Sequence, residues 1–276
     1  MKSLFSVLLL AVVFSFLGRA VFAQGDLPSP VDDGGVLRME QGSPYDERWG
    51  RPLPLTPDTA RPLSPYREAR ALKKGILAPS SGDRMAFAEF LRRRHTGLIR
   101  LLPREVYDSQ TNHTKSPVSI RGGGAYYSFA MLTHFYGYGS DLELSRDWFS
   151  VGFAGADYGM LTMLGDVPLD QISERDPRAQ FLANYRPPAP EHLARAEARR
   201  FMLRGGVTFD GLNYQSRQPV FEHWTYLLRS ISYRNSDVLV AFRVVRKDND
   251  GSVIIAWKLL KQYPTPELTQ TTSRSK

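Results

Sequence analysis

The chain has 276 residues, with 36 Lys and Arg against 28 Asp and Glu, which gives a formal net charge of +8. It contains no cysteine, which excludes a disulfide framework, thiol catalysis and a thiolate metal site, so the hydrophobic core must stabilise the fold unaided. No stretch after the first 23 residues approaches the roughly 20 uninterrupted apolar residues that a membrane-spanning helix requires.

Residues 1–23 have the pattern of a secretory signal peptide. Lys2 precedes an apolar run over 4–17, and small or apolar residues lead up to Ala23 at the positions that a signal peptidase reads. We therefore expect cleavage near Ala23 and a secreted or periplasmic mature chain. Loss of this segment, with two basic residues and no acidic one, lowers the formal charge from +8 to +6. In that compartment a basic protein favours anionic or glycan polymers of the envelope over nucleic acid as partners.

Residues 24–79 predict a proline-rich, disordered linker. They hold nine of the 19 prolines and show little periodicity. An α+β globular domain is expected over 80–264, followed by a disordered tail over 265–276. The sequence leaves the oligomeric state open.

The first element of the domain is predicted to be a helix from Asp83 to about His95. Asp83 is a suitable N-cap, and apolar residues recur at helical spacing before a glycine ends the pattern. The basic residues Arg92, Arg93 and Arg94 would lie in the last turn, where they complement the helix dipole; an anion-binding patch is the alternative. A short strand over 98–102 should follow.

The segment 122–159 is the most unusual in composition, because it holds eight of the 22 glycines and ten of the 32 aromatic residues. Alternation over 126–136 predicts a strand whose amphipathic face carries Tyr126, His134 and Tyr136. A turn is expected at 145–147, where the apolar phase reverses, and another strand at 158–164.

The remaining elements complete a mixed fold. Helices are predicted over 177–185 and 190–203, and three strands joined by two turn signals over 226–261 form an antiparallel meander. We read the turn at 248–251 as a hairpin rather than a calcium loop, because the spacing of an EF-hand is absent. The expected class is α+β, with antiparallel sheets built from two β-meanders and a helical segment between them in one domain.

The aromatic residues suggest a recognition surface. Flat rings can stack on sugar faces or hold an exposed polymer while polar groups fix its orientation. The first functional hypothesis is therefore a non-enzymatic exported domain that binds a glycan-like envelope or extracellular polymer. Its predicted ligand-binding residues are Tyr126, His134, Tyr136, Tyr138 and Trp148.

Two alternatives remain open. Asp141 and Glu143 are predicted to share the solvent face of a strand, with Asp147 near them across a turn, and paired carboxylates can cleave glycosidic bonds. The other alternative is a protein-interaction domain that uses a sheet edge or the basic helix end. No cofactor or metal is expected, because the five histidines are far apart and no glycine spacing matches a dinucleotide or phosphate loop.

Overall fold

The computed structural model describes residues 75–108, 122–134, 136, 139–153, 156–203 and 205–269. The predicted signal peptide, nearly all of the predicted linker and Tyr138 lie outside the described residues. Within the described residues, no helix is long and apolar enough to cross a membrane.

The described residues form short helices and three antiparallel sheets, which confirms a mixed α+β fold. The helical elements are α2 (Ser81–Ala86), α3 (Ala88–Leu91), α4 (Arg104–Tyr107), η2 (Leu169–Gln171), η3 (Pro177–Ala179), α5 (Gln180–Asn184) and α6 (Glu191–Leu203). The strands are β1 (Thr96–Leu101), β2 (Tyr126–Tyr127), β3 (Leu142–Ser145), β4 (Trp148–Ser150), β5 (Tyr158–Gly165), β6 (Val207–Phe209), β7 (Leu212–Tyr214), β8 (Arg217–Pro219), β9 (Thr225–Ser232), β10 (Ser236–Lys247) and β11 (Val253–Gln262).

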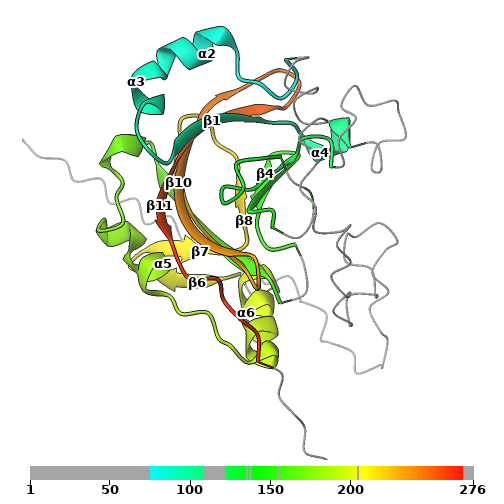
Figure 1. Cartoon of the computed structure of the whole chain (residues 1–276), viewed down its shortest axis with the longest axis vertical. Helices are drawn as coiled ribbons and strands as arrows, with labels where there is room; N and C mark the ends of the chain where they lie inside the picture. Colours follow the sequence, from blue (N-terminus) through cyan, green and yellow to red (C-terminus); the bar gives the residue numbers. More distant parts are fainter. Residues whose placement is uncertain are drawn as a thin grey trace, which may run out of the picture. The chain divides into compact units, whose positions relative to one another are not determined.

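The largest sheet has the strand order β1-β11-β10-β9-β5. Its long central strands are rich in apolar residues, and consecutive residues on both faces are buried over most of their length. A second sheet, β2-β3-β4-β8, lies on the concave side of the first, and Figure 1 shows the large sheet curving around β4 and β8. The strand β1 is therefore an edge of the large sheet.

Each face of the large sheet carries its own hydrophobic core. Phe149, Phe242 and Trp257 belong to the core shared with the second sheet. On the other face, Leu182 of α5 and Phe201 of α6 pack against the same strands. After β11, the chain still contacts the segment before α6, where Thr269 forms a β-bridge with Pro190.

The helix predicted from Asp83 to His95 is wrong in its bounds. The structure has two short helices, α2 and α3, and the N-cap is Ser80, whose hydroxyl accepts a hydrogen bond from the Asp83 N–H while the Asp83 carboxylate accepts from the Ser80 N–H. The second helix ends at Leu91, and the Thr96 hydroxyl at the start of β1 lies within hydrogen-bond distance of the carbonyl oxygens of Phe90 and Arg93. Arg92–Arg94 thus follow the helix instead of forming its last turn.

The strand predicted over 126–136 is also wrong beyond Tyr127. The chain turns back after Ser128, which bridges to Thr133, and Leu132 adopts a left-handed conformation with φ of 56°. Alternation therefore does not decide which side chains share a face in this segment.

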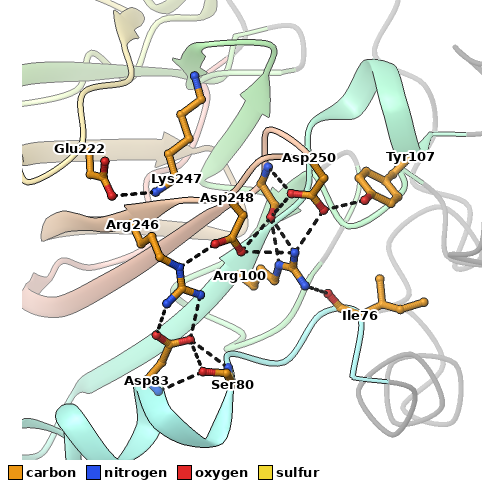
Figure 2. A network of polar contacts seen from close by, with 11 residues as sticks. Ile76, Ser80, Asp83, Arg100, Tyr107, Glu222, Arg246, Lys247, Asp248 and Asp250 are labelled. Carbon is orange, nitrogen blue, oxygen red and sulfur yellow. Dashed lines mark hydrogen bonds and ion pairs between the residues drawn. The ribbon is translucent and has the colours of Figure 1, made fainter.

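Two arginines hold the turn between β10 and β11 against the rest of the domain (Figure 2). Arg100 of β1 lies 3.1 Å from the Asp250 carboxylate and 3.3 Å from that of Asp248. Arg246 joins Asp248 to Asp83 of α2, with nitrogen–oxygen distances of 2.6 Å and 3.1 Å. The acidic turn thus pairs with guanidinium groups, in agreement with the hairpin interpretation.

Candidate functional site

A pocket of about 380 Å³ opens at the edge strand β1, and we call it the β1 pocket. It lies between the first half of β1, the end of β11 and the turn that follows β2. Its walls are formed by residues 95–99, Tyr127, Phe129, Ala130, Leu132, Trp257, Leu259 and Gln262. The lining combines apolar side chains with polar atoms, among them the side-chain groups of His95, Thr96 and Gln262.

Three aromatic rings form the base of the β1 pocket. Phe129 packs edge-to-face against both Tyr127 and Trp257, with 5.2 Å between ring centroids in each pair. The sheet register places Gly97 opposite Trp257, and a β-carbon at Gly97 would lie 2.5 Å from the indole ring. Only glycine lets the indole lie this close to the edge strand. The three rings are 2% to 5% exposed, so little of their ring faces is available for a ligand to stack on.

The turn 128–133 forms one wall, and Asp141 holds it in place. The Asp141 carboxylate accepts hydrogen bonds from the N–H of Phe129 at 2.6 Å and of Ala130 at 3.3 Å. Asp141 is fully buried, and burial raises its pKa to about 6 against hydrogen bonds that lower it. Met131 and Leu132 at the tip of the turn are 39% and 63% exposed, so apolar surface continues outside the pocket.

The basic residues predicted in the last turn of a helix instead lie in the segment between α3 and β1. Arg92, Arg94 and His95 are exposed, and Arg92 and Arg94 make no ion pair with any described carboxylate. Arg93 differs, because it pairs with Asp170 at 2.6 Å and with Glu89 at 3.9 Å. The predicted anion-binding group therefore includes two exposed guanidinium groups that form no ion pair with a described carboxylate.

The predicted aromatic recognition row is not brought together on one exposed face. Tyr126 and His134 are 5% and 4% exposed, and they face different neighbours, since Tyr126 packs on Tyr136 and His134 packs on Tyr127. The shared face predicted for Tyr126, His134 and Tyr136 depended on a strand that ends after Tyr127. Trp148 is 37% exposed, with the Arg217 guanidinium 4.7 Å from its ring centroid.

The carboxylates predicted on a solvent face are buried, which corrects that assignment. Glu143 accepts hydrogen bonds from the Tyr126 hydroxyl at 2.6 Å and from Arg104 at 3.1 Å. Burial raises the pKa of Glu143, while its partners act in the opposite direction. Asp147 lies at the predicted turn and binds Lys247 at 2.5 Å, on the exterior. Glu143 and Asp147 thus each have a hydrogen-bonding or ion-pair partner among the described residues.

Comparison with protein-family models, curated proteins and solved structures gave no match. Among the described residues, no group of three or more histidine, aspartate or glutamate side chains is placed to hold a metal ion. The geometry of the β1 pocket is therefore the basis for a functional proposal.

Sequence reasoning missed most of the residues of the β1 pocket. A signal was present at Gly97, because an isolated glycine within a strand indicates that another group approaches the backbone closely. The identity of that group, Trp257, depends on a pairing across 160 positions of the chain that only the sheet register reveals.

Proposed function

We propose that the chain is an exported, non-enzymatic domain that binds a polymer of the cell envelope or the extracellular space at the β1 pocket. The observation that carries the proposal is the pocket itself, about 380 Å³ in volume, whose lining combines apolar side chains with polar atoms. Sites that bind ligands usually have this size and character. The predicted signal peptide supports the compartment, and the basic charge supports an anionic partner.

The exposed lining indicates which part of a polymer the pocket suits. Leu132 is exposed at the rim, and the partly exposed Leu98 and Leu259 lie nearby, whereas the aromatic rings beneath are nearly enclosed. A sugar that stacks on an aromatic residue needs an open ring face. Apolar substituents of a polymer therefore fit this lining better than sugar faces do.

The proposal includes a single domain over 80–264, with the strands of both meanders and the intervening helices as one unit. Its support is the core on the concave face of the large sheet, which contains Phe149 from the second sheet and Phe242 from the first. Such a shared core would fix the walls of the pocket relative to each other.

The test is a retention assay with purified residues 24–276 on insoluble envelope material, with reducing sugar measured in the supernatant. We expect retention without sugar release, and we expect Leu132→Asp to abolish retention. Leu203→Asp is the matched control, because Leu203 is 68% exposed against 63% for Leu132 but lies at the end of α6. Absence of retention overturns the proposal. Sugar release that Glu143→Gln abolishes would instead establish a glycan hydrolase.

A further inference from the structure

The outer edge of β1 is divided into a covered half and an open half. β1 pairs with β11 alone, and the Leu259 N–H donates to the His95 carbonyl oxygen across that pair. Since backbone groups of successive residues point to opposite edges of a strand, odd-numbered residues of β1 face β11 and even-numbered ones face outward.

The second half of this outer edge is covered within the domain. His134 Nε2 donates to the Arg100 carbonyl oxygen at 2.8 Å, and the Leu102 N–H donates to the Gly124 carbonyl oxygen at 3.1 Å. The outward N–H and C=O groups of Thr96 and Leu98 have no such partner among the described residues, and both residues line the β1 pocket. Four backbone hydrogen-bonding groups thus belong to residues that line the β1 pocket.

Proteins commonly protect an exposed strand edge with a charged residue, a proline or a bulge. Thr96, Gly97 and Leu98 include none of these, and the β1–β11 register is continuous through them. The two register shifts of β11 lie on its other side, in its pairing with β10. This part of the edge retains the regular geometry that an added strand requires.

The charges beside the open half select the chemistry of a partner. Arg92 and Arg94 are exposed, without a described ion-pair partner, and they directly precede β1. Figure 1 shows α3 and β1 next to each other at this edge of the sheet. An extended chain along Thr96–Leu98 would therefore pass close to two uncompensated positive charges, which favour carboxylates.

We propose that the open half of β1 binds an extended polypeptide segment of a partner protein by strand addition. Its backbone pairs with Thr96 and Leu98, an apolar side chain enters the β1 pocket beside Leu132, and an acidic residue faces Arg92 and Arg94. In strand addition the main chain supplies affinity, and pockets for alternate side chains supply specificity. This inference rests on the proposed binding function and specifies the polymer as polypeptide.

The test selects binders to residues 24–276 from a phage-displayed library of random twelve-residue peptides. We expect enriched peptides to share apolar residues two positions apart and at least one Asp or Glu. Arg92→Glu with Arg94→Glu should weaken binding of such a peptide at least tenfold. The matched control is Arg186→Glu with Arg199→Glu, an equal change of charge at two exposed arginines without described ion pairs, and it should leave binding within twofold.

A second variant tests the backbone contacts. Leu98→Pro removes an outward N–H but none of the hydrogen bonds to β11, and proline is tolerated at such an edge position. We expect a folded protein by circular dichroism that no longer binds the peptide. Selected peptides without the pattern, or binding that survives both variants, would overturn the inference. A dimer of the chain that Leu98→Pro dissociates would assign the edge to a second copy and also overturn it.

The two proposals can fail separately. Retention on envelope material that Leu132→Asp abolishes, together with a library that yields no binder, would leave the pocket as a binding site and reject strand addition. Absence of both retention and peptide binding would reject the function as well.

Discussion

Replacement of Asp141 by Asn should change how the stability of the domain depends on pH. Burial raises the pKa of Asp141 from 3.8 to about 6 in the folded protein. Because the folded-state pKa is the higher one, the carboxyl group ionises first in the unfolded chain as the pH rises. The free energy of unfolding therefore falls from about pH 4 onward and levels off above about pH 7.

The structure sets the size of this effect. At about 1.4 kcal/mol for each pKa unit, the difference between the two pKa values corresponds to about 3 kcal/mol over the whole titration. About half of that loss, roughly 1.5 kcal/mol, falls between pH 5 and pH 8. Asn keeps a carbonyl oxygen for the N–H groups of Phe129 and Ala130 but cannot ionise, so this contribution should be absent from the variant.

Urea unfolding of wild type and Asp141→Asn at pH 5 and pH 8 measures the contribution. All other titrating groups act equally on both proteins, so the change in their stability difference isolates Asp141. We expect the free energy of unfolding of Asp141→Asn, relative to that of wild type, to rise by about 1.5 kcal/mol between pH 5 and pH 8. A stability difference that is the same at both pH values would refute the reasoning. Asp141→Ala removes the acceptor and should cost about 1–3 kcal/mol more than Asn.

Two further substitutions test the packing of the large sheet. Asp237→Ala should lower the free energy of unfolding in urea by about 3–5 kcal/mol. The reason is that the Arg229 guanidinium, which is 1% exposed, loses its carboxylate partner at 2.8 Å. A loss below about 1 kcal/mol would contradict this. Gly97→Ala should cost about 1–3 kcal/mol and change tryptophan fluorescence, since its β-carbon would meet the Trp257 ring. Gly82→Ala in α2 is the control, because a β-carbon there would lie 3.7 Å from its nearest neighbour, the Ser80 hydroxyl oxygen, and this variant should be more stable by about 0.5–1 kcal/mol. Equal losses in both variants would refute the packing argument.

The regular strands could be predicted from the sequence because local pattern and tertiary environment agree there. Alternation and the Asp-Gly turn signal predicted the strands now described as β10 and β11, and the phase reversal predicted the turn at 145–147. In these segments a shift by one residue would expose a whole apolar face, so periodicity carries reliable information.

Alternation failed between Tyr127 and Asp141 because a buried carboxylate determines the local structure there. Asp141 binds the N–H groups of Phe129 and Ala130, which in a continuous strand would pair with a neighbouring strand. The sequence pattern that predicts a strand continues past Tyr127, but the chain reverses at a turn. The hydrogen bonds to Asp141 that hold this turn leave no periodic pattern in the sequence of the turn itself.

The same argument explains why two of the candidate catalytic carboxylates, Asp141 and Glu143, are buried. Asp141 and Glu143 are separated by one residue, a spacing typical of the wet face of a strand. The second sheet is itself covered, so both side chains are buried and each acquires its own hydrogen-bond donors. Whether alternating carboxylates are exposed depends on which sheet face is covered, and that requires the topology.

The stretch 92–98 joins two features that sequence reasoning treated separately. Its basic residues were assigned to a helix dipole, and its apolar residues to a strand. Because α3 ends at Leu91, the charges lie directly before an edge strand, and because Thr96–Leu98 carry no charge, that edge is open beside the β1 pocket. A one-turn extension of α3 would place Arg92–Arg94 in the helix and remove this juxtaposition. The position where the helix ends therefore determines whether the basic residues and the sheet edge can act on one partner.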